Sequence, residues 1–183
     1  LIREKTYSDP HVKLSSTSLR AWYAMRLIQN SMCRNSLIFT LILIVFGLDQ
    51  ATKSLVTGSL ERGESWPSEG IFRITSSFNT GSAFGLFTGQ NTLLIFVSIL
   101  GIGFLSWIYG RQKHPKRLLT ASLALQLGGA LGNLSDRLFI GHVVDFIDVG
   151  PWPIFNVADA SIVIGLGTLG WLFITNRIDH GLG

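Results

Sequence analysis

The sequence is poor in charged residues and in cysteine. Asp, Glu, Lys and Arg make up 14% of its 183 residues, whereas a soluble domain usually carries about 25%. The deficit indicates that lipid surrounds much of the chain, because charges are costly in a bilayer. The single cysteine, Cys33, excludes an internal disulfide and a cysteine-based metal cluster.

Several common catalytic motifs are also missing. The sequence contains no HExxH zinc motif, no nucleophile elbow of a serine hydrolase and no phosphate-binding loop. Its four histidines, at positions 11, 114, 142 and 180, are scattered along the chain. These absences disfavour a metalloenzyme, a serine hydrolase and a nucleotide-dependent enzyme.

Four long apolar runs are present, at residues 36–56, 93–109, 118–135 and 160–176. A helix needs roughly 17–25 residues to cross the hydrocarbon of a bilayer. The runs therefore predict an all-α membrane protein with four transmembrane helices. Asp49 and Lys53 fall in the last turns of the first run, four positions apart. They can pair on one helix face, and a salt bridge at the helix end is their simplest interpretation.

The basic residues predict the orientation. Six Lys or Arg residues precede the first run, and residues 111–117 carry four more with no acid. By contrast, residues 136–148 carry three aspartates and one arginine. Because cytoplasmic loops are enriched in Lys and Arg, both termini are expected in the cytoplasm. The net charge of +4 then reflects membrane topology, and no nucleic-acid partner is expected.

This pattern divides the chain into three parts. Residues 1–35 are polar, basic and without a clear period, so we expect a disordered cytoplasmic extension. Residues 36–176 form the predicted four-helix membrane domain. Residues 177–183 form a short cytoplasmic tail.

The third run combines small and polar residues. Gly128 and Gly132 form a GxxxG pair, which favours close helix packing in lipid. Asn133, Asp136 and Arg137 follow, and on a helix they share one face. An Asp–Arg pair at the membrane interface or a role in positioning substrate would both explain them.

A second polar string, which contains Asn79 and Gly81, precedes the second run. The glycines and aromatic residues of this string favour a re-entrant or surface-lying turn, although a plain loop would have the same composition. The amide of Asn79 can both donate and accept hydrogen bonds in a partly dry site.

The most informative segment lies before the fourth run. Residues 143–148 favour an extended strand, on which Asp145 and Asp148 point to opposite faces. Asn156 and Asp159 fit an N-cap and the third helical position. Asp145 and Asp159 are 14 positions apart, so a folded-back loop can bring them together. Two close carboxylates share one proton, which is the chemistry of an aspartic protease.

These strings, in this order, resemble the bacterial lipoprotein signal peptidase family (signal peptidase II). The resemblance covers residues 36–176 and rests on Asp-Gln-Ala-Thr-Lys (49–53), Phe-Asn-Thr-Gly-Ser-Ala-Phe-Gly (78–85), residues 128–137, Val-Val-Asp-Phe (143–146) and Phe-Asn-Val-Ala-Asp (155–159). It implies that Asp145 and Asp159 are the catalytic dyad. The supporting or substrate-binding positions that go with this assignment are Asp49, Lys53, Asn79, Gly81, Asn133, Asp136, Arg137 and Asn156.

The resemblance also implies a substrate and an architecture. The substrate is a prolipoprotein whose cysteine already carries diacylglycerol, and cleavage falls just before that cysteine. The enzyme is a multi-pass protein of the bacterial inner membrane with an extracytoplasmic active site, and it needs no metal or other cofactor. A small β-element from the first outward loop and a short surface helix near the fourth span accompany the four helices. We expect a monomer in contact with membrane lipid.

Two other classes remain as alternatives. A small ion or proton carrier would use the same carboxylates as a cation site, although they cluster toward one surface and no internal repeat is evident. A structural or assembly subunit would tolerate replacement of Asp145.

Overall fold

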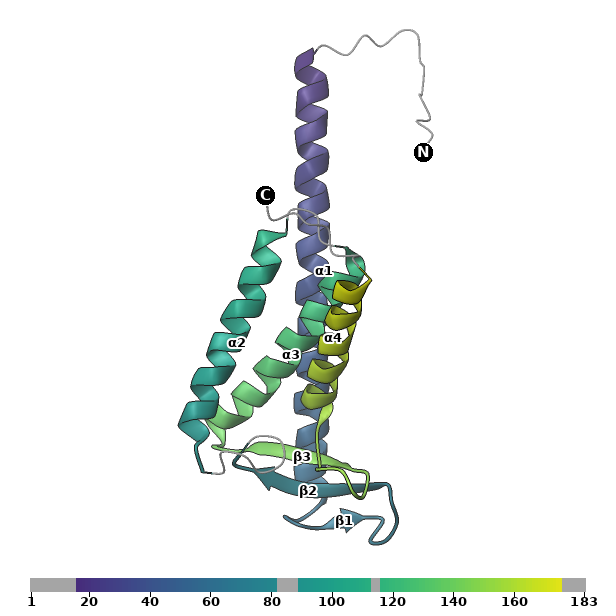
Figure 1. Ribbon diagram of the computed structural model, residues 1–183, viewed down its shortest axis with the longest axis vertical. Helices are drawn as coiled ribbons and strands as arrows, with labels where there is room; N and C mark the ends of the chain where they lie inside the picture. The colour runs from purple at the N-terminus through teal and green to yellow at the C-terminus, as the bar shows by residue number, and fades with distance from the viewer. Residues whose placement is uncertain (1–15, 82–88, 113–115, 176–183) are drawn as a thin grey trace. The chain divides into compact units, whose positions relative to one another are not determined.

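The computed structural model describes residues 16–81, 89–112 and 116–175, with side chains from residue 35 onward (Figure 1). Its elements in chain order are α1 (Ser16–Ser59), β1 (Ser65–Trp66), β2 (Arg73–Asn79), α2 (Asn91–Arg111), α3 (Arg117–Phe139), β3 (Val143–Asp148) and α4 (Val157–Ile174). The chain divides into two compact units, residues 1–36 and 37–183.

The first unit differs from the expected disorder. Residues 16–35 are helical and form the first part of α1, while residues 1–15 lie outside the described part. The sequence contains no glycine or proline between Pro10 and Gly47. Without either helix breaker, the helix of the first apolar run can extend toward the N-terminus.

Within the described residues, three helices are long and apolar enough to cross a membrane: Asn35–Ser59, Asn91–Arg111 and Val157–Ile174. They correspond to the first, second and fourth predicted runs, the last of which was expected to reach Asn176, outside the described residues. The third run is also a helix, α3, but it is more polar than the other three. The protein is therefore mostly helical with three candidate membrane spans.

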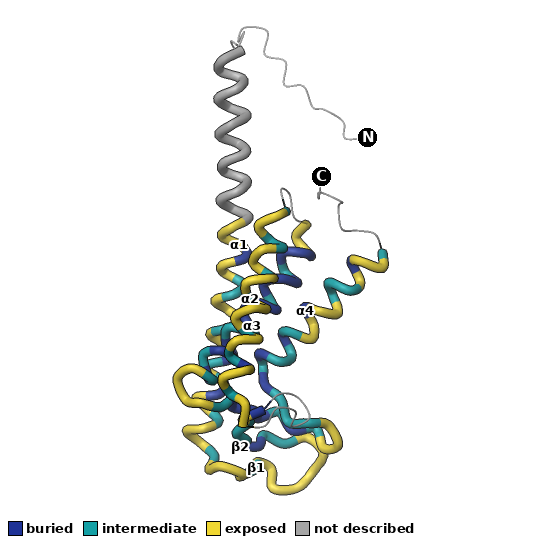
Figure 2. The backbone as a smooth tube through the Cα atoms, turned by 60° about the vertical axis from the view of Figure 1, so that its left-hand side comes forward, coloured by how far each residue is buried: buried dark blue, intermediate teal, exposed yellow. Residues whose placement is uncertain are grey.

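Helix α3 lies at the centre of the helical bundle in the second unit. One apolar cluster joins Ile38 of α1 to Ala124 and Leu127 of α3, and another joins Leu119 and Leu123 to Leu172 of α4. Thirteen residues of α3 are buried, against one in α2 and four in α4. Figure 2 shows how much of the remaining helical surface is exposed. Protein surrounds α3, which explains how it can be polar.

The small residues of α3 allow the close packing that the GxxxG pair predicted. A Cβ atom on Gly128 would lie 2.8 Å from Val45 Cβ, and one on Gly132 would lie 2.5 Å from Asp49 Oδ2. A Cβ atom on Gly129 would collide with the carbonyl oxygen of Ala158. Both α1 and the start of α4 therefore approach the backbone of α3 too closely for a larger side chain.

A three-stranded antiparallel sheet, in the order β1-β2-β3, lies across one end of these helices (Figure 1). Strand β3 covers the residues predicted to be extended. Asn79 pairs with Val143 and Arg73 with Asp148, with an irregularity between Ile74 and Ser77. The sheet thus joins the segment after α1 to the segment before α4.

The prediction of a short surface helix near the fourth span is wrong for the segment that leads into α4. Residues 149–156, all of which are described, form turns and extended chain. Gly150 has a φ of 80°, and Pro151 and Pro153 follow it. Prolines at this spacing remove backbone donors and disfavour helix in the residues before them.

Candidate active site

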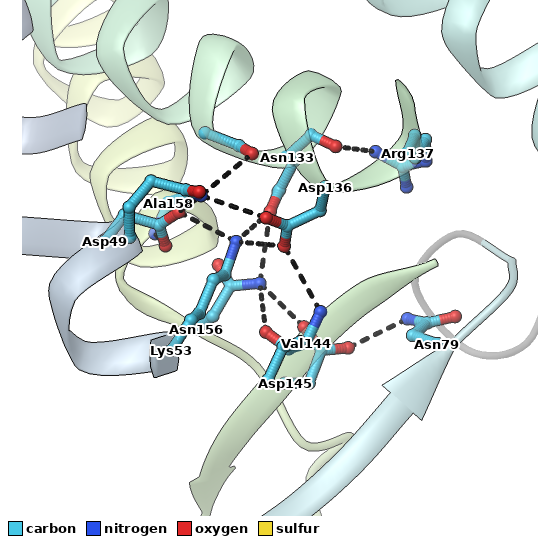
Figure 3. A network of polar contacts seen from close by, with 12 residues as sticks. Asp49, Lys53, Asn79, Asn133, Asp136, Arg137, Val144, Asp145, Asn156 and Ala158 are labelled. Atoms are coloured by element: carbon cyan, nitrogen blue, oxygen red, sulfur yellow. Dashed lines mark hydrogen bonds and ion pairs between the residues drawn. The ribbon is translucent and has the colours of Figure 1, made fainter. Parts of the chain in front are cut away.

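A buried ion cluster connects the end of α1 to α3. Lys53 Nζ lies 2.7 Å from Asp49 Oδ2 and 2.8 Å from Asp136 Oδ2. All three side chains are at most 5% exposed. The predicted Asp49–Lys53 pair is therefore present, and Asp136 pairs with Lys53, which differs from the interfacial Asp–Arg pair that was one of two explanations of this segment (Figure 3).

Asp49 also connects this cluster to α4. Its Oδ1 accepts a hydrogen bond from the backbone N–H of Ala158 (2.9 Å), which is one of the donors left unpaired at a helix start. Asp136 similarly accepts from the N–H of Val144 on β3 (3.3 Å). Two carboxylates, one on α1 and one on α3, thus hold the segments that bring Asp145 and Asp159 to the site.

Gln50 is a member of the cluster that the sequence analysis missed. Its Nε2 donates to Asp136 Oδ1 (2.9 Å) and to Asp49 Oδ2 (3.2 Å). The only signal was its position beside Asp49 near the end of an apolar run, where a polar side chain needs a partner.

The amides of Asn133 and Asn156 connect the cluster to both candidate catalytic aspartates. Asn133 Oδ1 accepts from Lys53 Nζ (3.0 Å) and from Asn156 Nδ2 (3.1 Å), while its Nδ2 donates to Asp159 Oδ1 (2.8 Å). Asn156 Nδ2 donates to Asp145 Oδ1 (2.7 Å). The two carboxyl groups are therefore held by one continuous chain of amides, although they come from different elements.

Asn156 performs the capping role expected of it as well. Its Oδ1 accepts from the backbone N–H of Asp159 (2.8 Å), so it is the N-cap of α4. The residue is fully buried, and its Nδ2 is the donor that reaches Asp145. Helix capping and organisation of the site therefore use opposite ends of one side chain.

Asp145 is buried, 2% exposed, and in the described part of the chain its carboxyl group accepts from two neutral donors. Asn79 Nδ2 donates to Oδ2 (2.9 Å) and Asn156 to Oδ1. Burial, together with the nearby charge of Asp159, raises the pKa of Asp145 to about 7, against the opposing effect of the two amides and of Lys53. A carboxyl group with this pKa can exchange a proton near neutral pH.

Arg137 and Gly81 lie beside these carboxylates. Arg137 Nη2 donates to the carbonyl oxygen of Gly81 (3.2 Å), and the N–H of Gly81 donates to Asn79 Oδ1 (2.8 Å). The bond between the Gly81 N–H and the Asn79 side chain forms a turn at the expected place. Residues 82–88 of the same string lie outside the described residues. Arg137 places a positive charge next to the pair without forming a salt bridge to either aspartate.

A cleft of about 940 Å³ opens beside both aspartates. Its polar wall contains Asn79, Asn133, Arg137, Asp145 and Asp159. Its other wall is apolar and comes from the turn before α4 and from α4 itself, where Trp152, Phe155, Ile162, Val163 and Ile164 line it. The cleft therefore offers two titratable groups at one side and an apolar surface at the other.

The structure brings all ten predicted site residues into one hydrogen-bonded network beside this cleft, which Gly81 joins through its backbone contacts with Asn79 and Arg137. Asp148, which was not assigned to the site, lies apart and binds Arg73. Among the described residues, no group of three or more His, Cys, Asp or Glu is placed to hold a metal ion. Asp145 and Asp159 both line the cleft, which places acid–base chemistry by two carboxyl groups within its reach.

Comparison with known proteins identifies one family in both the family models and the sequence relatives. The family model described as signal peptidase (SPase) II matches residues 41–175. The lipoprotein signal peptidase of Halothermothrix orenii is 41% identical over 134 residues, which cover 73% of this chain and 92% of that protein. The lipoprotein signal peptidase of Moorella thermoacetica is 42% identical over 142 residues, covering 77% and 95%.

Solved structures agree with the sequence relatives. A structure described as a bacterial membrane enzyme superposes with a TM-score of 0.73 at 29% identity, covering 79% of this chain and 92% of that one. A second structure with the same description gives a TM-score of 0.68 at 29% identity.

Proposed function

The chain belongs to the signal peptidase II family, and from this premise we propose which of its residues cut the peptide bond. The family is one of aspartic-type membrane endopeptidases that remove signal peptides from lipoproteins. We propose Asp145 and Asp159 as the catalytic dyad. The observation that supports this most strongly is that both carboxyl groups line one cleft and share one chain of buried amides.

In the proposed reaction the two carboxyl groups share one proton. The ionised group removes a proton from a water molecule, whose oxygen attacks the scissile carbonyl carbon, while the protonated group donates a hydrogen bond to the carbonyl oxygen. The resulting tetrahedral intermediate collapses when its C–N bond breaks, and the leaving nitrogen takes up a proton from the pair. The raised pKa of Asp145 supports this cycle, because such a group can hold and release a proton near neutral pH.

The polar residues around the dyad have proposed positioning roles. Asn133 and Asn156 fix the two carboxyl groups, and Asn79 holds Asp145 from the other side. Arg137 and the turn at Gly81 line the cleft and are placed to bind the substrate backbone. Asp49, Lys53 and Asp136 hold α1, α3, β3 and the start of α4 together.

We propose a diacylglyceryl-modified prolipoprotein as the substrate, with cleavage just before the lipidated cysteine. The apolar wall of the cleft supports this choice, since Val163 and Ile164 line the cleft and are 68% and 58% exposed. Acyl chains can reach this wall from the membrane without leaving it. Burial of acyl chains contributes about 0.8 kcal/mol per CH₂, so lipidation would determine which peptides bind.

The proposed topology has four spans, with α3 as the third, and both termini in the cytoplasm. The sheet and the cleft then lie on the extracytoplasmic side of a bacterial inner membrane. The charge pattern of the loops supports this orientation. We propose that the protein works as a monomer, because the residues assigned to the reaction all come from one chain.

Cleavage by the purified protein in detergent tests the proposal. Wild-type protein should release the signal peptide from a diacylglyceryl-modified prolipoprotein and leave the same precursor intact when it lacks the lipid. Asp145→Asn and Asp159→Asn should each lower the rate about 10²–10⁴-fold while the protein remains folded. Normal cleavage by either folded variant would exclude the dyad, and an inactive but folded wild type would exclude the peptidase function.

A further inference from the structure

Lys53 is placed to do more than connect two helices. Its Nζ has three partners, Asp49 Oδ2, Asp136 Oδ2 and Asn133 Oδ1 (3.0 Å), so all three of its N–H bonds have an acceptor. Two of these acceptors are carboxylates that would hold an ion cluster together. The third is a neutral amide one contact away from Asp159.

The amide contact determines which way Asn133 faces. A carboxamide has an oxygen that accepts and a nitrogen that donates. Because Lys53 and Asn156 both donate to Oδ1, the nitrogen of Asn133 must face the opposite way, toward Asp159 Oδ1. A reversed amide would place two donors against one NH₂ group and an oxygen against a carboxylate.

The same contact connects Lys53 to Asp145. Asn156 Nδ2 donates to Asn133 Oδ1, to the carbonyl oxygen of Val144 and to Asp145 Oδ1, so the orientation of Asn133 helps to hold the donor that Asp145 receives. One ammonium group thus supports the N–H donors of both carboxyl groups. The geometry is visible in Figure 3, where Lys53 and Asn156 lie between Asp136 and Asp145.

We propose that Lys53 is a positioning residue of the peptidase reaction, which orients the Asn133 and Asn156 amides so that the dyad keeps one negative charge near neutral pH. This inference depends on the proposed function of the dyad and adds a residue to it. The effect is electrostatic as well as geometric, since the charge of Lys53 lowers the pKa of Asp145.

Other charged groups face the dyad and must be counted. They are Asp49 on α1, Asp136 and Arg137 on α3, and the two aspartates themselves on β3 and α4. Asp49 and Asp136 are both neutralised in part by Lys53. Replacement of Lys53 therefore removes a positive charge and also releases two negative ones, and both changes disfavour an ionised dyad.

The test is the pH dependence of cleavage by Lys53→Met, a neutral side chain of similar length. Both midpoints of the pH–rate profile should move upward by about one pH unit, because every ionisation of the dyad becomes less favourable. Lys53→Arg, which keeps the charge, should restore most of the wild-type profile. KM should change much less than kcat, because Lys53 does not touch the cleft.

Arg73→Met is the matched control. It also removes the cation of an ion pair, the partly buried pair with Asp148, but Arg73 lies outside the amide chain. It should lower thermal stability and leave the midpoints of the profile unchanged. If Lys53→Met retains wild-type midpoints, or if Arg73→Met shifts them equally, Lys53 has only a structural role and the proposal is wrong.

Two additions keep the outcome interpretable. If Lys53→Met does not fold, the double variant Lys53→Met/Asp136→Asn preserves the net charge of the cluster and should show a smaller upward shift, because the loss of amide orientation remains while one released negative charge is removed. A ¹³C NMR titration of the Asp145 carboxyl group in wild type and variant requires no substrate. If the wild type cleaves nothing, the proposed function fails, while a higher midpoint of Asp145 in the variant would still establish the effect of Lys53.

Discussion

Strand β3 carries two aspartates, Asp145 and Asp148, whose side chains are both little exposed but chemically different. Asp145 is 2% exposed and Asp148 is 4% exposed. Asp148 accepts from Arg73, Thr75 and the Gly150 N–H, at 2.6 to 3.0 Å. Asp145 accepts from two neutral amides and lines the cleft beside Asp159.

The difference appears in the pKa values. The Gly150 amide, with Arg73 and Thr75, holds the pKa of Asp148 below its ordinary value despite burial. At Asp145 the effect of burial prevails, and the pKa rises to about 7. Burial alone therefore does not predict the role of a carboxylate. With a cationic partner, Asp148 stays ionised near neutral pH and links β3 to β2, whereas neutral donors and a second carboxyl group leave Asp145 able to titrate.

The largest expected difference between Asp145 and Asp148 is in the rate of cleavage after substitution. Asp145→Asn should lower the cleavage rate about 10²–10⁴-fold, whereas Asp148→Asn should stay within about twofold of wild type per folded molecule. Both variants replace a buried carboxylate on one strand by an amide, so each is the control for the other. Equal losses in the two folded proteins would show that the site needs an intact sheet and not the Asp145 carboxyl group.

The free energy of unfolding should change in opposite directions in Asp148→Asn and Asp145→Asn. At pH 8, Asp148→Asn should destabilise the fold by about 2 kcal/mol, because Arg73 and two other donors lose an ionised acceptor. Asp145→Asn should stabilise the fold by about 2 kcal/mol, because an ionised carboxylate no longer has to be buried. Thermal unfolding in detergent measures both changes.

The pH dependence of these changes follows from the pKa shifts. Asp145 has a folded pKa above the unfolded value of about 4, so its contribution to stability is lost as the pH rises toward 7. The gain in Asp145→Asn should therefore shrink toward pH 4. Asp148 has a lowered pKa, so its contribution is present above pH 4 and is lost in more acidic solution. A gain at pH 8 that persists unchanged to pH 4 would contradict the assignment for Asp145.

The smallest expected effect comes from the neighbours on β2. Asn79→Ala removes a donor that lowers the pKa of Asp145, so the acidic midpoint of the pH–rate profile should rise by about 0.5 pH unit. Thr75→Val removes the corresponding donor to Asp148 and should leave the midpoint in place. A lower acidic midpoint in Asn79→Ala, or an equal change of the midpoint in Thr75→Val, would contradict the distinction between Asp145 and Asp148.

Much of the local structure was predictable from the sequence. Four apolar runs of sufficient length all form helices, and residues 143–148 form the expected strand. The Asp49–Lys53 pair and the Asn156 cap involve residues within one turn, so their spacing alone predicts the contact. The surface helix was expected from the family resemblance, although Gly150, Pro151 and Pro153 disfavour it.

The long-range contacts were not predictable in the same way. Lys53 and Asn133 are 80 positions apart, and nothing in either string indicates that an ammonium group fixes the direction of that amide. A pair between Asp136 and the adjacent Arg137 was one of two explanations of that segment, but the packing of α1 against Gly128 and Gly132 brings Lys53 to Asp136. Gln50 was missed for the same reason, since its partners become visible only when α1 and α3 are side by side.

The polarity of α3 has a consequence for how the protein enters the membrane. An Asp at the centre of a lone helix costs about 2.5–3.5 kcal/mol to insert, and α3 carries Gln126, Asn133 and Asp136 on its buried surface. As the proposed third span, it gains a stable place in the bilayer only after α1 supplies Lys53 and its glycines find their neighbours. Membrane insertion would then follow an order: α1 inserts first, α3 becomes stable in the bilayer by packing against α1, and α4 packs last. Because α4 carries Asp159, its insertion would also bring Asp159 to Asp145, so a partly inserted chain would have no peptidase activity.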